Sequence, residues 1–199
     1  MTDSDQTTPA DSPASPPKAR LGRESLNLPN LITLSRLVLA VILFVVDQAI
    51  KAYVTGPLNL RVVGNIDLLP FFDLTYVENH GISMGMFQAS NMEMRWLLVG
   101  LTALIALVVA VWMMREKLLG DIIGLALILG GALGNIVDRY SLGYVIDYAD
   151  FHIGDFRPFL VFNVADAAIT IGVVIILARS LFMSDKDENS DTNAVQAEN

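Results

Sequence analysis

Two aspartates stand in apolar stretches of the sequence and could act together in catalysis. Asp166 lies in Phe-Asn-Val-Ala-Asp-Ala-Ala-Ile (162–169), and Asp147 lies in Gly-Tyr-Val-Ile-Asp-Tyr (143–148). Two carboxyl groups held close together cannot both ionise cheaply, so one keeps a proton and the other is a base. Such a pair can hydrolyse a peptide bond without a metal, because the base takes a proton from water while the acid donates to the carbonyl oxygen.

An amide accompanies Asp166. Asn163 lies three residues before it, a spacing that puts both side chains on one face of a helix. A hydrogen-bond clasp between helices is the alternative explanation for this pair.

Further polar residues are expected at the same depth as the two aspartates. Asn135, Asp138 and Arg139 close the stretch Gly-Asn-Ile-Val-Asp-Arg (134–139). Asp47 and Lys51 are spaced i, i+4 at the end of an apolar run, where a surface ion pair is the simplest interpretation. Solvated helix ends explain some of these residues but do not explain Asp166.

Four apolar segments must position these side chains. They predict helices at about 31–52, 95–114, 118–138 and 159–179. A bilayer core of ~30 Å needs ~20 helical residues, and each segment supplies that number. In the fourth helix Asp166 would lie about seven residues, roughly 10 Å, inside the span. An ionised carboxylate there costs at least ~2.5 kcal/mol, so Asp166 should face the bundle.

The composition agrees with a membrane protein. Of the 199 residues 53% are hydrophobic and 17% are charged, and the mean hydropathy is +0.52. A soluble domain carries roughly 25% charged residues. The chain has no cysteine, which excludes disulfides and thiolate ligands, and a zinc site would depend on His80 and His152. We therefore expect no metal and no cofactor.

The positions of lysine and arginine predict the orientation, because cytoplasmic loops are enriched in them. Eight lie on the side of the two termini and five on the other side. We expect both termini in the cytoplasm and the two longer loops, about 52–95 and 139–158, on the outside. A small β element is expected at 68–77, between the first two helices, because that stretch is rich in aromatic and β-branched residues. The predicted fold class is thus an all-α membrane protein of four transmembrane helices with one small extracytoplasmic β element.

Two polar tails flank the helices. Residues 1–28 are rich in proline, serine and threonine, and residues 184–199 are acidic, so both are predicted to be disordered cytoplasmic tails. The C-terminal tail carries much of the formal net charge of -8. Nucleic acid is therefore not an expected partner.

Five motifs together resemble a known family. They are Val-Val-Asp-Gln-Ala-Ile-Lys (45–51), Tyr-Val-Glu-Asn-His-Gly-Ile-Ser-Met-Gly (76–85), Gly-Asn-Ile-Val-Asp-Arg (134–139), Gly-Tyr-Val-Ile-Asp-Tyr (143–148) and Phe-Asn-Val-Ala-Asp-Ala-Ala-Ile (162–169). Their order and the predicted four-helix topology resemble the lipoprotein signal peptidase family, signal peptidase II, over about residues 30–182. Met84 stands where that family usually has phenylalanine.

The resemblance implies an aspartic endopeptidase of the bacterial inner membrane. It would remove the signal peptide from diacylglyceryl-modified prolipoproteins by cleaving before the lipidated cysteine, near the outer face, with residues 29–183 as the peptidase domain. We expect its partners to be these substrates and membrane lipid, and the chain to be a monomer. By position, Asp147 and Asp166 match the catalytic pair and Asp138 matches a structural carboxylate. The positions matching substrate-binding or orienting residues are Asn163, Asn135, Arg139, Asn79, Gly81, Asp47 and Lys51.

Two other functions would also use features of this sequence. The stretch Leu-Pro-Asn-Leu-Ile-Thr-Leu-Ser-Arg (28–36) resembles the first helix of membrane phosphatidyltransferases, but the aspartate array that holds their metal ions does not occur here. An ion- or proton-translocating protein would use Asp166 and Asp47, yet no acidic residue is predicted near the midplane. The glycines of the third helix, Gly124, Gly130, Gly131 and Gly134, are expected to serve close helix packing.

Overall fold

Four long helices form the body of the protein. The computed structural model describes the backbone of residues 28–81 and 92–197, and the side chains of 36–81 and 92–182. The long helices are α1 (Leu28–Thr55), α3 (Met92–Arg115), α4 (Leu119–Ser141) and α5 (Val164–Ala197). Stretches of 19 to 24 residues in these helices are long and apolar enough to cross a membrane, which confirms the four predicted spans. For the first three helices, the predicted ends lie within three residues of those observed.

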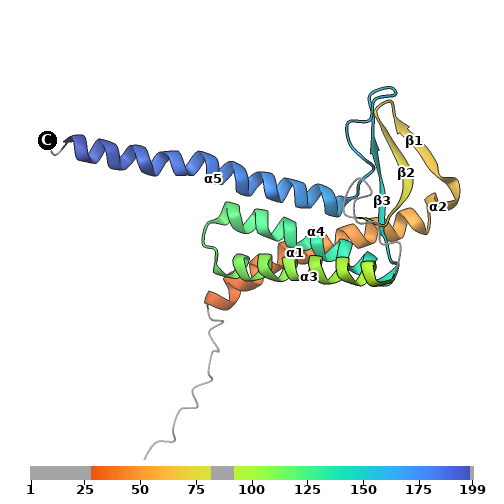
Figure 1. Cartoon of the computed structure of the whole chain (residues 1–199), viewed down its shortest axis with the longest axis horizontal. Helices are drawn as coiled ribbons and strands as arrows, with labels where there is room; N and C mark the ends of the chain where they lie inside the picture. The colour runs from red at the N-terminus through yellow and green to blue at the C-terminus, as the bar shows by residue number, and fades with distance from the viewer. Residues whose placement is uncertain (1–27, 82–91, 198–199) are drawn as a thin grey trace, which may run out of the picture.

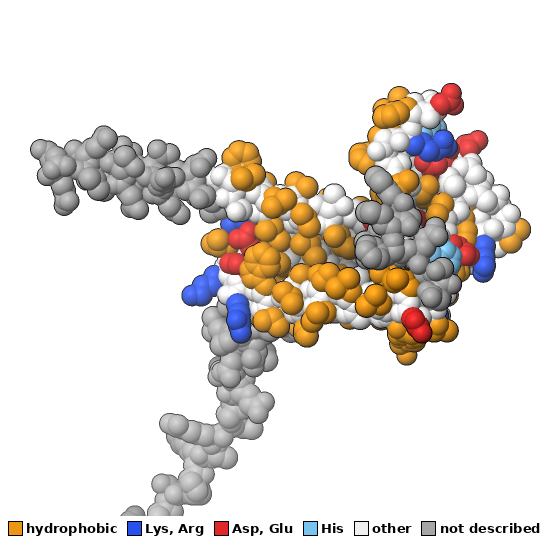
Figure 2. Space-filling view, viewed as in Figure 1, with side chains coloured by type: hydrophobic (Ala, Val, Ile, Leu, Met, Phe, Trp, Pro, Cys, Tyr) orange, Lys and Arg blue, Asp and Glu red, His pale blue; other side chains and the backbone are white. Residues whose placement is uncertain are grey.

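Helix α4 lies at the centre of the bundle and packs against α1, α3 and α5 (Figure 1). Large apolar side chains remain exposed on the outer surfaces of the helices, among them Leu97, Leu104, Val108 and Trp112 on α3. Figure 2 shows hydrophobic side chains over much of the visible surface of the bundle. Lipid tails can solvate such a surface, as the composition predicts.

The glycines of α4 lie where neighbouring helices approach most closely. A Cβ atom on Gly130 would come within 2.6 Å of the Ala40 carbonyl oxygen of α1. On Gly131 it would come within 2.4 Å of the Ala165 carbonyl oxygen of α5. Gly124 has similarly close neighbours in α5. The predicted packing role of these glycines is confirmed, because a methyl group at these sites would push the backbones apart.

A three-stranded antiparallel sheet extends sideways from one end of the bundle (Figure 1). Its strands are β1 (Asn65–Leu69), β2 (Phe72–Asn79) and β3 (Val145–Phe151), in the order β1-β2-β3, and the short helix α2 (Leu60–Val63) precedes β1. The β1–β2 hairpin confirms the β element predicted at 68–77. The third strand comes from the loop between α4 and α5 and was not predicted, so the sheet joins both connecting loops.

The predicted start of the fourth helix, residue 159, is wrong. α5 begins at Val164, and Phe162 pairs with Ala149 beside β3. Asp166 therefore lies in the first turn of α5 and not about seven residues inside it. Residues 159–162 are all apolar, but Phe162 makes its backbone hydrogen bonds to Tyr148 and Ala149 of β3 instead of helical ones. The backbone of α5 continues to Ala197, through most of the predicted tail 184–199. The disorder of both tails stays a prediction.

Candidate active site

Asp147 lies on β3, and amide groups hold both of its oxygens. Its Oδ1 accepts a hydrogen bond from Asn163 Nδ2 at 2.6 Å, and its Oδ2 accepts one from Asn79 Nδ2 at 2.9 Å. Asn79 ends β2, where it pairs with Val145 of β3. Only 1% of Asp147 is exposed. The sheet thus holds this carboxyl group inside the protein.

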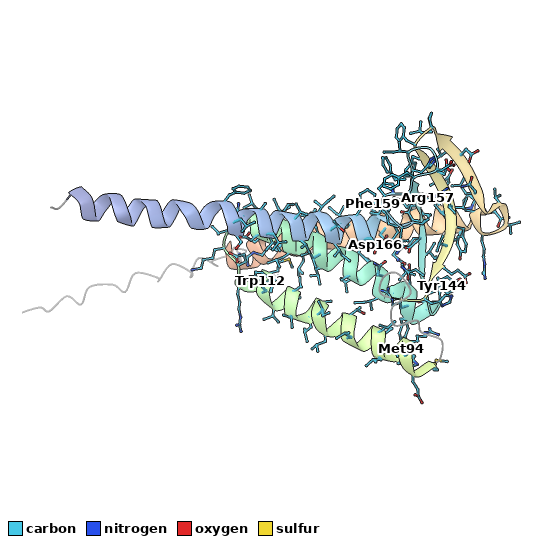
Figure 3. All side chains as sticks on the ribbon, turned by 45° about the horizontal axis from the view of Figure 1, so that its top comes forward. Met94, Trp112, Tyr144, Arg157, Phe159 and Asp166 are labelled. Atoms are coloured by element: carbon cyan, nitrogen blue, oxygen red, sulfur yellow. The ribbon has the colours of Figure 1, made fainter. Side chains whose placement is uncertain are left out.

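Asp166 reaches the same place from the start of α5. Asn163 caps this helix, because its Oδ1 accepts a hydrogen bond from Asp166 N at 2.9 Å. Asp166 Oδ2 in turn accepts one from Asn163 N at 3.4 Å, which completes a reciprocal capping box. The predicted i, i+3 pairing of Asn163 and Asp166 is therefore a cap and not a shared helix face. Figure 3 shows Asp166 at the end of α5 that meets the sheet.

Two amides connect the carboxyl groups. Asn135 of α4 donates from Nδ2 to Asp166 Oδ1 at 2.8 Å. Its Oδ1 lies 3.3 Å from Asn163 Nδ2, the group that also donates to Asp147. The amides of Asn135 and Asn163 thus link two carboxyl groups from different elements through a chain of hydrogen bonds. Asp147 is buried, whereas Asp166 is half-buried.

The surroundings favour the protonated form of Asp147. Burial and the neighbouring charge of Asp166 raise the pKa of Asp147 from its usual value of 3.8 to about 7. Hydrogen bonds from Asn79 and Asn163 and the positive charge of Lys51 act in the opposite direction. This carboxyl group can therefore hold a proton near neutral pH, as an acid of the predicted chemistry must.

Asp47, Lys51 and Asp138 form a buried ion cluster behind the two aspartates. Lys51 Nζ lies 2.8 Å from Asp47 Oδ2 and 2.8 Å from Asp138 Oδ2. It also donates to Asn135 Oδ1 at 3.2 Å. The surface ion pair predicted for Asp47 and Lys51 is wrong, because these side chains are only 0% and 3% exposed. Gly134 of α4 gives Asp47 this room, since a Cβ there would lie 2.3 Å from Asp47 Oδ2.

The ion cluster also contacts the start of α5. Asp47 Oδ1 accepts a hydrogen bond from Ala165 N at 3.1 Å, one residue before Asp166. Gln48, which the sequence did not single out as a site residue, donates to Asp138 Oδ1 at 3.0 Å and to Gly134 O at 3.3 Å. The sequence feature that could have identified Gln48 is its place beside Asp47, as a second polar residue at the end of an apolar helix.

Arg139 and Gly81 lie beside the aspartates. Arg139 donates from Nη2 to Gly81 O at 3.0 Å, and Gly81 N donates to Asn79 Oδ1 at 3.1 Å. Arg139 Nε is buried without a hydrogen-bond partner among the described residues. The structure therefore brings together all ten residues singled out from the sequence. Met84 lies outside the described residues.

The histidines lie apart from the two aspartates and do not form a metal site with other acidic side chains in the described ranges. Among the side chains of 36–81 and 92–182 no group of three or more histidine, aspartate or glutamate residues could hold a metal ion. His80 lies near Glu78, whereas His152 lies 3.1 Å from Asp73.

The chain is similar in sequence to proteins of one known family. The family model described as Signal peptidase (SPase) II matches residues 39–182. A lipoprotein signal peptidase of Sphingopyxis alaskensis is 55% identical over 155 residues, which cover 78% of this chain and 90% of the relative. One of Rhizorhabdus wittichii is 54% identical over 146 residues, which cover 73% and 85% of the two chains.

A solved structure described as a bacterial membrane enzyme, determined by the in meso method, has the same fold. It is 25% identical, with a TM-score of 0.66 over 76% of this chain and 90% of that chain. The protein is thus a multi-pass bacterial membrane protein. Its family model and its relatives make it an aspartic peptidase that cleaves signal peptides from prolipoproteins, and the chain belongs to the signal peptidase II family.

Proposed function

We propose that Asp147 and Asp166 are the catalytic pair of this peptidase. The observation that carries the proposal is the position of Asn163, whose side chain bonds to Asp147 and caps the helix turn that holds Asp166. Amide side chains bring together two carboxyl groups from separate elements. Because an amide is uncharged, one carboxyl group can be ionised while the other keeps its proton. A purely structural clasp would not need a second carboxyl group.

The two aspartates have different surroundings, which supports a division of roles. Asp166 lies in the first turn of α5, where the helix dipole stabilises negative charge. Asp147 is buried, with a pKa raised to about 7 by that burial and by the charge of Asp166. We assign Asp166 as the base and Asp147 as the acid.

The reaction follows from these assignments. Asp166 takes a proton from a water molecule, whose oxygen attacks the carbonyl carbon of the scissile peptide bond. Asp147 donates its proton to the carbonyl oxygen, which forms a neutral tetrahedral diol. The proton on Asp166 then passes to the leaving nitrogen, the carbon–nitrogen bond breaks, and one hydroxyl of the diol returns its proton to Asp147.

The surrounding residues have supporting roles in this proposal. Asn135, Asn163 and Asn79 orient the carboxyl groups, and Arg139 with Gly81 binds the substrate backbone. Asp47, Lys51 and Asp138 hold α1, α4 and the start of α5 together. Asp47 is fully buried and bonded to Lys51 and Ala165, which argues against the ion-pathway alternative.

The substrate is a prolipoprotein whose cysteine carries diacylglycerol, with cleavage before that cysteine. Each methylene of the lipid is worth ~0.8 kcal/mol in an apolar phase, so the scissile bond stays at the membrane boundary. Asp147 and Asp166, called the dyad below, lie at the end of the membrane helices that carries the sheet. This position is suitable for cleaving a bond held at the membrane boundary. We place this end at the outer face of the inner membrane and both termini in the cytoplasm. We expect the chain to act as a monomer.

The test uses purified protein and a diacylglyceryl-modified prolipoprotein, with and without EDTA. We expect cleavage to survive the chelator and to be lost in Asp147→Asn and in Asp166→Asn. Asp155→Asn, which changes an exposed carboxylate on the loop after β3, is the control and should cleave normally. Metal dependence, or full activity of either dyad variant, would contradict the proposal.

A further inference from the structure

An arginine of α3 holds the end of α4 next to the dyad. The last carbonyl groups of a helix lack partners within the helix. Arg95 donates from Nε to Arg139 O at 2.9 Å and from Nη2 to Tyr140 O. Arg139 O also accepts a hydrogen bond from Gly143 N at 3.2 Å. A single guanidinium group therefore caps the end of α4, where a positive charge is also favoured by the helix dipole.

The same guanidinium lies against the turn that follows α4. Gly143 has a φ of +92°, in the region that favours glycine, and a Cβ there would lie 3.2 Å from Arg95 Nη1. Arg95 also lies over the ring of Trp96, 5.6 Å from its centroid, and Trp96 packs edge-on against Tyr140 at 5.7 Å. The attraction between the guanidinium and the Trp96 ring helps to hold Arg95 against this turn.

The residues on both sides of this turn in the sequence contact the candidate active site or belong to it. Backwards, Arg139 donates to Gly81 O beside Asn79, the partner of Asp147. Forwards, β3 begins at Val145 and reaches Asp147 two residues later. A displacement of the turn would therefore move the Arg139 side chain and Asp147 together.

We propose that Arg95 is a positioning residue of the peptidase, which acts through the end of α4 on Arg139 and Asp147. This inference rests on the proposed dyad. The two N–H groups of the guanidinium have fixed directions that match two successive carbonyl groups, whereas a lysine ammonium is a point charge without this geometry. Arg95 makes these contacts to backbone atoms and none is to a reacting group, so its loss should lower kcat through Asp147 and raise KM less, through Arg139.

The protein contains a matched control at the other end of the bundle. Arg36 of α1 donates from Nη1 to Met113 O at 3.3 Å and to Met114 O at 2.8 Å, at the end of α3. It caps a neighbouring helix as Arg95 does. Figure 3 shows Trp112, one residue before Met113, at the opposite end of the bundle from Asp166. Arg36→Ala thus removes a similar helix cap far from the dyad.

The experiment measures kcat, KM and the unfolding temperature of the full chain with lipid-modified prolipoprotein. Arg95→Ala should lower kcat about tenfold or more and change KM by a smaller factor, because a misplacement of ~1 Å can cost a hundredfold in rate. Arg36→Ala should lower the unfolding temperature but keep kcat. Arg95→Lys should keep the fold and still lower kcat; it decides the question if Arg95→Ala does not fold.

Three results would overturn the inference. They are an equal kcat for Arg95→Ala and Arg36→Ala, a full recovery of kcat in Arg95→Lys, and a change confined to KM. Asp147→Asn is measured in the same series. If it keeps its activity, the proposed dyad fails, while the comparison of Arg95 with Arg36 still reports whether the turn after α4 controls the rate.

A second variant tests whether Arg95 acts through the turn at Gly143. Gly143→Ala changes the same turn through its φ, so its effect on kcat should not add to that of Arg95→Ala. Additive effects of the two changes would show that Arg95 does not act through this turn and would also overturn the inference.

Discussion

At the scale of single residues, Asn163 does three things with one side chain. It donates to Asp147, lies close to Asn135 and caps α5 at Asp166. If Asp147 and Asp166 are the catalytic pair as proposed, capping and catalysis depend on the same amide. An N-cap contributes only about 1 kcal/mol to the free energy of unfolding. A loss of orientation of two catalytic groups, in contrast, lowers the reaction rate strongly.

We expect Asn163→Ala to lower kcat about a hundredfold, because the Asp147 carboxyl group loses the hydrogen bond from Asn163 Nδ2 and the helix turn that holds Asp166 loses its cap. The free energy of unfolding should fall by only about 1 kcal/mol. Steady-state cleavage and thermal unfolding in detergent check the two parts. Asn163→Asp keeps the capping oxygen but puts a third carboxylate against Asp147, so it should fold and remain inactive. An active Asn163→Asp would contradict this role.

The pKa of Asp147 predicts the basic side of the pH profile. Because its pKa is raised to about 7, the acid form is fully present below that value and is lost as the pH rises through it. We expect kcat to fall about tenfold per pH unit above about 7. A profile of kcat from pH 5 to 9 checks this. A rate that stays constant to pH 9 would remove Asp147 as the acid.

At the scale of elements, the glycines of α4 decide how close α1 and α5 can approach. Gly134 faces Asp47 and Gly131 faces Ala165, so both lie on the path from the helix bundle to the dyad. The ion cluster of Asp47, Lys51 and Asp138 forms only because α1 and α4 meet at this distance. The glycine pattern is thus part of the scaffold of the candidate site as well as of the packing.

We expect Gly134→Ala to lower both stability and activity, because the new methyl group would overlap Asp47 Oδ2. Gly100→Ala on α3 is the matched control, since a Cβ there meets nothing within 4 Å. That change should be neutral or stabilising by up to about 1 kcal/mol through helix propensity. Unfolding temperature and cleavage rate are measured for both. Equal behaviour of the two variants would contradict the close approach at Gly134.

At the scale of the whole molecule, the bundle has two different ends. One carries the sheet and the dyad, and the other carries the short α3–α4 connection with Arg115 and Lys117. The bias of basic residues predicts that the second end faces the cytoplasm. The dyad would then meet substrates whose mature part has already crossed the membrane.

The absence of cysteine makes this orientation simple to measure. Asp155→Cys, in the exposed loop after β3, should react with a membrane-impermeant maleimide in intact spheroplasts. Lys117→Cys, exposed between α3 and α4, should react only after the membrane is permeabilised. The unchanged chain gives the background. The reverse pattern of labelling would invert the proposed orientation.

The sequence by itself determined the four membrane helices, the β1–β2 hairpin and the residues that meet in the site. Hydropathy and residue type are local properties, and they specify spans and hairpins without knowledge of distant partners. The sequence motifs also selected Asp147 and Asp166 together. None of these predictions required knowing how the helices pack.

Only the tertiary structure decided where α5 begins and which partners surround the charges of Asp47 and Lys51. The apolar run before Val164 was compatible with helix, but Phe162 found hydrogen-bond partners on Ala149 of β3, and Asn163 became a cap. Asp47 and Lys51 could have been a surface pair, but Asp138 and the start of α5 enclose them. The physical reason is the same in both cases: a polar group takes the partner that packing brings to it, and that partner lies far away in the sequence.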